Sequence, residues 1–291
     1  MTDLTVKIGF FVLILAWVGV TLAIVLYRGC LSPAAFRLAP RRRVGIRGFD
    51  ILIGIGLALY GTVMLGMLLS AIGATPGEDE AAADLGPMTY AVRILASQLL
   101  IQGLIALYLV MRASRVRRGV YRLGILPRRF GRELRMTFLG LLAAVPLAMG
   151  ANMLTVTIGN LLGIPAPQIG HDVLAWLTSP QPWPALVMVV LSAVVIAPIL
   201  EEMTYRGLLQ TALLHMLGED RRWPAILITA ACFALVHSRV AAWQAMPGLF
   251  VLGVVFGYLY EKSGSLLPPI LVHLCFNALN IIMVMTITNP Q

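Results

Sequence analysis

The stretch "PALVMVVLSAVVIAPILEEMTYRGLL" occupies residues 184–209. Its first part has no charged residue, and then two carboxylates and a guanidinium follow within six residues, at Glu201, Glu202 and Arg206. An apolar run of about 20 residues has the length of a helix that crosses a bilayer. Ionisable groups in such a helix are costly and tend to face the bundle interior or water. The stretch therefore predicts a membrane helix with a functional polar cluster.

The whole chain has the composition of a membrane protein. It contains 291 residues, of which 59% are hydrophobic and 12% are charged, whereas soluble domains carry about 25% charged residues. We therefore predict an all-α membrane protein, a bundle of about eight transmembrane helices. The expected spans are residues 6–27, 48–73, 88–111, 136–162, 184–206, 223–238, 243–260 and 267–287.

The positive charge lies beside the apolar runs. The formal net charge is +9, and 15 of the 22 Lys and Arg residues fall in the segments 28–47 and 112–135. Cytoplasmic loops of membrane proteins have this pattern, and they lie near the anionic inner leaflet. We therefore expect both segments in the cytoplasm, with 74–87, 163–183 and both termini outside. The basic charge is explained without a nucleic-acid partner.

The ionisable residues near the expected spans are unevenly distributed between the two parts of the chain. Residues 1–162 hold four expected spans and the basic loops, and residues 163–291 hold the other four with most of the polar cluster. No soluble domain or long linker separates the two parts, so we expect one compact unit. Three cysteines without a CxxC pair indicate neither a disulfide framework nor a cysteine-rich metal site.

The spacing within the opening stretch suggests two roles for its carboxylates. Glu202 and Arg206 are four residues apart, so on a helix they share a face and can pair. Glu201 points about 100° away from Glu202. One glutamate can therefore be held by the arginine while the other is left to act, although a structural ion pair at a span end is the simpler interpretation.

Two further apolar segments carry histidines. "CFALVHS" (232–238) places His237 on the same helix face as Phe233, and "PPILVHLCFNALN" (268–280) places His273 and Asn277 four residues apart. A carboxylate can activate water, while imidazole and carboxamide groups can donate to a developing oxyanion. Glu201, His237 and His273 are also a zinc-type ligand set with room for water. Both arrangements describe hydrolysis of an amide by activated water.

These motifs resemble those of one family. "EEMTYRGLL", "FALVH" and "HLCFN" match, in order, the EExxxR, FxxxH and HxxxN motifs of the CPBP family, which comprises the CAAX prenyl proteases and bacteriocin-processing enzymes and is also called Abi. The matched region runs from about residue 184 to 287. The resemblance implies eight transmembrane helices around an intramembrane active-site cavity, and endopeptidase activity on a membrane-associated peptide or lipidated protein.

The resemblance also implies roles for the residues. Glu201 and His237 would activate water, His273 and Asn277 would stabilise the oxyanion, and Glu202 and Arg206 would support the site. Asparagine is a poor zinc ligand and a good oxyanion donor. We therefore expect a mechanism without a cofactor, and a zinc-dependent protease using the same residues is the alternative.

Two other functions use similar residues. A transporter or channel could carry ions along Glu, His and Arg side chains, although a relay does not need Asn277 or the paired spacing. A non-catalytic immunity or scaffold protein is the third candidate, and the complete motifs argue against it. The Arg-, Ala- and Leu-rich chain is typical of bacteria, so we expect a multi-pass protein of a bacterial cell membrane. Bacteria generally lack prenylated CAAX proteins, which favours another membrane-adjacent substrate.

The expected spans create a conflict of depth. If the fifth span begins at residue 184, Glu201 lies about 26 Å along it, near the inner face. His237 ends the sixth span and would then lie near the outer face. The apolar pattern "LLQTALLHML" (208–217) favours a fifth helix that is longer than expected, or bent near Pro198, with His215 a structural residue on its extension.

Overall fold

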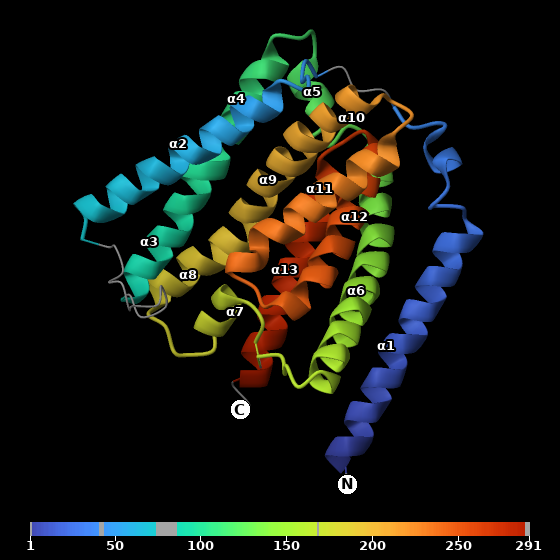
Figure 1. Cartoon of the computed structure of the whole chain (residues 1–291), viewed down its shortest axis with the longest axis vertical. Coiled ribbons are helices and arrows are strands. Elements are labelled where there is room, and N and C mark those ends of the chain that lie inside the picture. Colours follow the sequence, from blue (N-terminus) through green and yellow to red (C-terminus); the bar gives the residue numbers. More distant parts are fainter. Residues whose placement is uncertain (1, 41–43, 74–85, 168, 289–291) are drawn as a thin grey trace.

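The computed structural model describes residues 2–40, 44–73, 86–167 and 169–288, and within them the chain is a bundle of helices (Figure 1). The first part contains α1 (Thr2–Tyr27), η1 (Pro33–Phe36), α2 (Asp50–Ala71), α3 (Pro87–Ser97), η3 (Gln98–Gly103), α4 (Leu104–Ser114), α5 (Gly119–Leu123) and α6 (Phe130–Leu161). The second part contains α7 (Asp172–Trp176), α8 (Trp183–Leu191), η4 (Ser192–Ile196), α9 (Ala197–Glu202), η5 (Met203–Gln210), α10 (Thr211–Leu217), α11 (Arg222–Val236), η6 (His237–Arg239), η7 (Trp243–Ala245), α12 (Met246–Ser263) and α13 (Leu267–Thr288).

Six helices in the described ranges are long and apolar enough to cross a membrane. They are Asp50–Ala71, Pro87–Ser114, Phe130–Leu161, Trp183–Leu217, Trp243–Ser263 and Leu267–Thr286. The protein is therefore a multi-pass all-α membrane protein, which confirms the predicted fold class.

The two remaining predicted spans are also helical. α1 has 26 residues. α11 has only 15, which is a rise of about 22 Å, less than the roughly 30 Å of a hydrocarbon core. The count of eight spans stays a prediction.

Helices from both parts of the chain share the core. α12 packs against α6, α11 and α13, and α3 packs against α8. Each of three apolar clusters contains residues from before and after position 162, as in the cluster that joins Ala144 and Ala148 to Phe233 and Phe256. α1 packs along α6 at the edge of the bundle, and it begins at the end of the bundle where α13 finishes (Figure 1).

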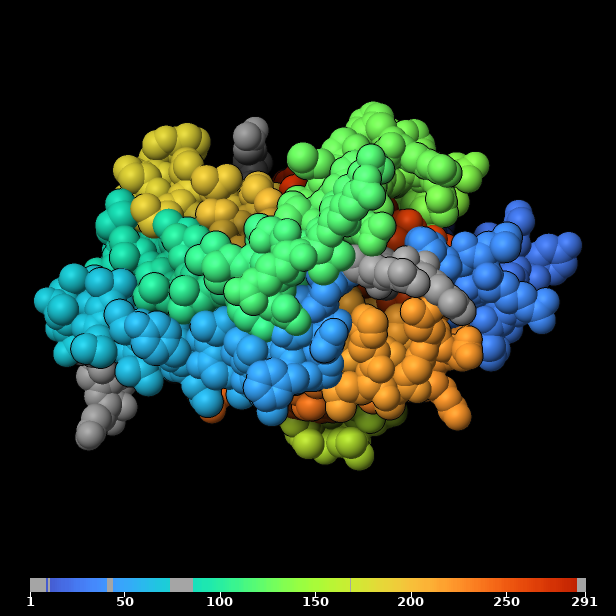
Figure 2. Space-filling model, turned by 90° about the horizontal axis from the view of Figure 1, so that it is seen from above, coloured from blue at the N-terminus to red at the C-terminus, as the bar shows by residue number. Residues whose placement is uncertain are grey.

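The opposite end of the bundle carries the basic loop after α4. In Figure 2 the green segment that follows α4 lies beside the blue segment that leads into α2. Arg112 joins the two: its Nη2 donates to the carbonyl of Gly45 at 2.7 Å, and its Nε donates to the Asp50 carboxylate at 3.0 Å. Asp50 is thus a paired residue at a span end. The predicted loop 74–87 lies almost entirely outside the described residues.

The helix that carries the opening stretch is longer than predicted. It runs without a break from Trp183 to Leu217, and we refer to it as the motif helix. The predicted end at residue 206 was wrong, because the charges there are neutralised inside the bundle and do not mark a membrane boundary. The predicted extension through residues 208–217 is confirmed, and Glu201 lies near the middle of the helix.

The motif helix contains two wider, π-helical turns. Pro198 has no N–H group and cannot complete the normal hydrogen bond to the carbonyl of Val194, and the π-helical turn η4 lies at this point. A second π-helical turn, η5, begins directly after Glu202. Turns of this kind often occur at functional sites, and here they flank the two glutamates.

Candidate active site

Glu202 and Arg206 form a fully buried ion pair. Arg206 Nη1 donates to Glu202 Oε1 at 2.8 Å, and both side chains are 0% exposed. Arg206 Nη2 also donates to the carbonyl of Gly253 on α12 at 3.1 Å. Because an unpaired charge in an apolar interior is costly, these contacts hold the carboxylate of Glu202 and the guanidinium of Arg206 together.

Two aromatic rings hold the Arg206 guanidinium in place. Its central carbon lies 5.0 Å from the ring centroid of Phe233 on α11 and 5.1 Å from that of Phe256 on α12. Rings at this distance attract a cation. Arg206 is therefore bound by groups from three elements, and its position depends on how α11 and α12 pack against the motif helix.

His273 on α13 contacts both glutamates. Its Nδ1 lies 3.1 Å from Glu202 Oε1, and its Nε2 lies 3.8 Å from Glu201 Oε2. The ring stacks on Phe256 with centroids 4.9 Å apart. Glu201 retains 13% exposure of its side chain, whereas Glu202 has none. Of the two carboxylates, Glu201 is therefore the accessible one.

Asn277 lies one helical turn after His273 on α13. Its Nδ2 donates to the carbonyl of Ala193 in η4 at 2.9 Å. The widened turn supplies this acceptor, and the contact joins α13 to the motif helix. One N–H of the Asn277 carboxamide is used in this way, and the second hydrogen on Nδ2 remains for another acceptor.

His237 lies directly after α11 and reaches the site through Phe233. Its Nδ1 is 2.7 Å from the Phe233 carbonyl, and its ring centroid is 4.7 Å from that of Phe233, which in turn lies 5.9 Å from the ring of His273. A carbonyl only accepts, so Nδ1 carries the hydrogen and the neutral ring has its lone pair on Nε2. Within the described residues, no hydrogen bond or ion pair joins His237 to Glu201.

The lengths of two helices place His237 and Glu201 at the same level. The motif helix turns back after Leu217, and α11 begins at Arg222. Glu201 precedes this turn by 16 residues and His237 follows it by 15, which correspond to about 24 and 22 Å of helix. Tyr205 and Phe233, at matching positions, pack edge to face at 5.2 Å. This arrangement removes the expected conflict of depth.

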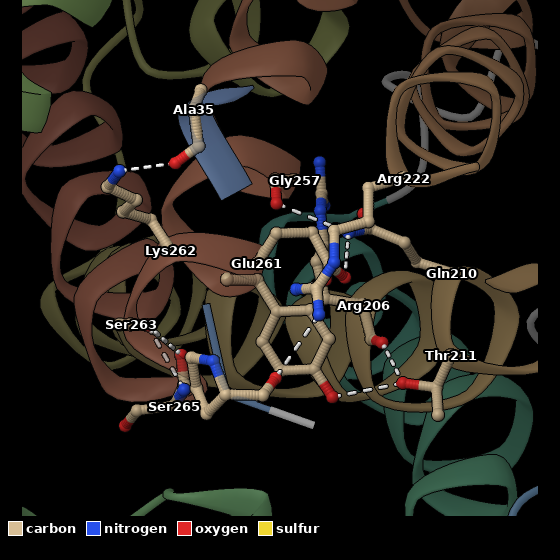
Figure 3. Close-up of polar contacts among 12 residues, drawn as sticks. Ala35, Arg206, Gln210, Thr211, Arg222, Gly257, Glu261, Lys262, Ser263 and Ser265 are labelled. Atoms are coloured by element: carbon tan, nitrogen blue, oxygen red, sulfur yellow. Dashed lines mark hydrogen bonds and ion pairs between the residues drawn. The ribbon is translucent and has the colours of Figure 1, made fainter. Parts of the chain in front are cut away.

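A second buried network holds α11 and α12 to the motif helix (Figure 3). Gln210 and Arg222 both donate to the carboxylate of Glu261 on α12, at 2.9 and 2.8 Å. Thr211 Oγ1 donates to the carbonyl of Arg206 at 2.9 Å. The network lies at the end of the bundle near the 217–222 turn, and it thereby fixes the level at which α11 delivers His237.

His171 is a residue near the site that the sequence did not single out. Asp172 N donates to the Val240 carbonyl at 3.0 Å, and Ala242 N donates to the Gly170 carbonyl at 2.9 Å. This short antiparallel bridge ties the loop before α7 to the loop after His237. The only signal in the sequence was a histidine in a loop without Lys or Arg, since contacts between loops depend on the topology.

We expect His171 to make stability depend on pH. Burial and the nearby His237 lower the pKa of His171 to about 4 from its ordinary 6.5, and its Nδ1 accepts from Val173 N at 3.3 Å. Below about pH 6.5 the unfolded chain binds a proton at this histidine that the folded protein does not bind. The stabilisation from neutral His171 is therefore complete above about pH 6.5 and is lost as the pH falls towards 4. His171→Asn keeps a capping side chain and should flatten the fall in Tm across this range.

Thermal unfolding in nanodiscs between pH 7 and 4.5 measures this effect. His215→Asn, at the exposed end of α10, is the matched control and should keep the wild-type slope. An unchanged slope in His171→Asn would show that His171 is not buried in its neutral form.

The residues of the zinc alternative do not gather into a metal site. Within the described ranges, no group of three His, Cys, Asp or Glu side chains is placed to hold a metal ion. Nδ1 of His273 is directed to Glu202 and Nδ1 of His237 to a carbonyl, so Nε2 is the nitrogen that remains for another partner on each ring. The mechanism without a cofactor and the zinc alternative both stay predictions.

A cavity in the described structure lies away from the candidate site. It lies between the start of α2 and the end of α4, and none of the site residues lines it. Its walls are Phe49, Asp50, Ile53, Tyr108, Met111, Arg112 and Arg115. An active-site cavity beside Glu201 stays a prediction.

Comparison with known proteins finds a family match over the part of the chain that contains the candidate site. Residues 182–279 match the family model described as "Type II CAAX prenyl endopeptidase Rce1-like". This match agrees with the resemblance to the CPBP family, and we refer to residues 182–279 as the CPBP region. All six candidate residues, from Glu201 to Asn277, lie inside this CPBP region, so the match supports the resemblance carried by the three motifs.

The other comparisons are less informative about function. The chain is similar to an "Uncharacterized 24.3 kDa protein" of Escherichia coli, with 26% identity over 117 residues. These residues are 40% of this chain and 52% of that protein, so the chain spans about half the length of the curated relative that it matches. No solved structure matches the chain.

Proposed function

We propose that the chain is an intramembrane endopeptidase that hydrolyses a peptide bond of a membrane-associated substrate. The observation that carries the proposal is the unequal environment of the two glutamates in the CPBP region. Glu202 is fully buried and paired with Arg206, whereas Glu201 is partly exposed and lies 3.8 Å from His273. Groups with opposed environments are a mark of acid–base catalysis.

Glu201 acts as the general base in this proposal. Its carboxylate accepts a proton from water, and the water oxygen attacks the carbonyl carbon of the scissile bond. His237 lies at the same level with the lone pair on Nε2, and it assists as a second acceptor. The C–N bond then breaks, and the proton held by Glu201 passes to the leaving nitrogen, giving a carboxylate and an amine.

His273 and Asn277 stabilise the oxyanion. In this proposal His273 acts as an imidazolium: its Nδ1–H is directed to Glu202, and its Nε2–H is the donor on the side of Glu201 and the reacting carbonyl. The second N–H of Asn277 is the other donor. Removing one such donor costs about 10²–10³ in kcat in characterised hydrolases.

A panel of peptides tests the proposal. Purified protein in nanodiscs is given three internally quenched peptides: a farnesylated CAAX peptide, the same peptide without lipid, and a peptide with an N-terminal acyl anchor. We expect cleavage of at least one anchored peptide, faster than that of the free peptide. Failure to cleave any of the three would count against the endopeptidase activity.

We also expect activity to survive removal of metal. The residues proposed to activate water need no metal ion, so treatment with 1,10-phenanthroline or EDTA should leave the rate within about twofold of its starting value. Elemental analysis of the active protein measures bound zinc independently. Stoichiometric zinc that restores a chelated, inactive enzyme would overturn the metal-free mechanism.

A further inference from the structure

The third predicted span carries two glutamines whose side-chain oxygens are unpaired in the described structure. Gln98 and Gln102 lie four residues apart in the π-helical turn η3. The side-chain oxygen Oε1 of each is buried and has no hydrogen-bond partner within the described part of the chain. A buried polar atom without a partner destabilises the fold. Two such atoms on one helix are free to bind a group from outside the chain.

The neighbouring residues show which way the glutamines face. One turn before Gln98, Ile94 packs in the cluster that contains Val189 and Val194 of the motif helix. One turn after Gln102, Ile105 and Ala106 pack in the cluster that contains Met203. Gln98 and Gln102 lie at intervals of four between Ile94 and Ala106, and η3 contacts α9, which contains Glu201. This spacing favours a position of the glutamines on the side of η3 towards the motif helix.

The other sides of η3 face α2 and the outside of the bundle. A side chain at Gly61 of α2 would place its Cβ 2.1 Å from the carbonyl oxygen of Leu100, so the backbones of η3 and α2 are in close contact here. Leu99 is 50% exposed and lies on the outside of the bundle. η3 therefore lies between α2 and α9, and in Figure 1 α3 runs beside α8, the first part of the motif helix.

Thr204 on the motif helix adds a third unpaired group. Its Oγ1 is buried and has no hydrogen-bond partner among the described residues, and it lies three residues after Glu201. The hydroxyl of a threonine both donates and accepts. Thr204 thus offers a further donor and acceptor three residues from Glu201.

We propose that Gln98 and Gln102 bind the backbone amides of an extended substrate segment beside Glu201. The inference rests on the proposed function. A peptide that enters an apolar bundle must replace the water bound to its N–H and C=O groups, or lose several kcal/mol for each. A carboxamide offers two donors and one acceptor oxygen, which complement both backbone groups. A carboxamide that binds the backbone does not depend on the substrate's side chains, so this contact permits many substrate sequences.

Methionine substitutions separate this role from a structural one. Gln98→Met and Gln102→Met keep the length of the side chain and remove its polar atoms. We expect KM for the panel peptide that the wild type cleaves fastest to rise about tenfold for each lost hydrogen bond, with kcat within about twofold. Tm should stay equal or rise, because an unpaired buried polar group has been removed. Leu99→Met, on the lipid-facing side of the same turn, is the control.

Backbone esters in the substrate provide a readout that a structural role would not move. Each ester replaces one N–H of the peptide. The wild type should lose affinity at one or two positions, and Gln98→Met or Gln102→Met should be insensitive to the ester at its own position.

The outcomes distinguish the two proposals. If the wild type cleaves the peptide while both variants keep its KM and its ester profile, the glutamines do not bind substrate and only this inference is wrong. A lower Tm with unchanged KM would show that they are structural. If the wild type cleaves no peptide of the panel, the proposed function fails and this inference fails with it.

Discussion

Glu201→Gln should lower kcat by about 10²–10⁴-fold, the range expected when a general base is removed. The amide has the shape of the carboxylate but cannot accept the proton from water. Among the described residues Glu201 forms no ion pair with Arg206, and its Oε2 lies 3.8 Å from Nε2 of His273. We therefore expect Tm to stay close to the wild-type value. Initial rates in nanodiscs, with Tm measured on the same samples, check both parts.

Glu202→Gln is the matched comparison for Glu201→Gln. Glu202 is fully buried between Arg206 and His273, so its loss leaves the guanidinium without its counter-charge. We expect this variant to be less stable, as well as less active. If Glu202→Gln lost activity at unchanged Tm and Glu201→Gln stayed active, the two roles would have been assigned to the wrong residues.

Arg206→Met should have the largest effect on stability, about 3–5 kcal/mol, which is typical for breaking a buried ion pair. Glu202 would keep its buried charge without a guanidinium, and the Gly253 carbonyl would lose a donor. Arg206→Lys should not restore the wild-type stability. A single ammonium group between the rings of Phe233 and Phe256 cannot replace the two nitrogens that donate to Glu202 and to the Gly253 carbonyl. Unfolding in denaturant measures the loss.

The double variant Glu202→Gln with Arg206→Met tests the cause. With both charges removed, the cost of an unpaired buried carboxylate disappears, so the double variant should be more stable than Arg206→Met alone. It should remain inactive, because His273 then lacks the carboxylate that positions it. A double variant whose loss equals the sum of the two single losses would show that the residues do not act as a pair.

Contacts within one helix were predictable from the sequence. The Glu202–Arg206 pair follows from a spacing of four residues, and the apolar runs indicated the membrane helices. The end of the motif helix was not predictable in the same way. Charges usually mark the edge of a span, and the sequence does not show that Arg206 finds Gly253, Phe233 and Phe256 inside the bundle.

Contacts between distant segments depend on topology. His273 meets Glu202 across 71 positions of sequence. The residue types and the resemblance to a family suggested one site, but neither predicted this contact. His171 reaches the neighbourhood of His237 through a pairing of two loops, for which the sequence has no periodic signal. Gln98 and Gln102 stand in an apolar run, and their unpaired oxygens become visible only once the neighbouring helices are in place.

The mass spectrum of the products tests the central claim most directly. The fastest panel peptide is incubated in H₂¹⁸O with the wild type and, separately, with Glu201→Gln in nanodiscs. The account predicts cleavage of one peptide bond by the wild type, with ¹⁸O in the new carboxylate, and almost no product from Glu201→Gln. Intact peptide with the wild type, or equal amounts of product from both proteins, would contradict it.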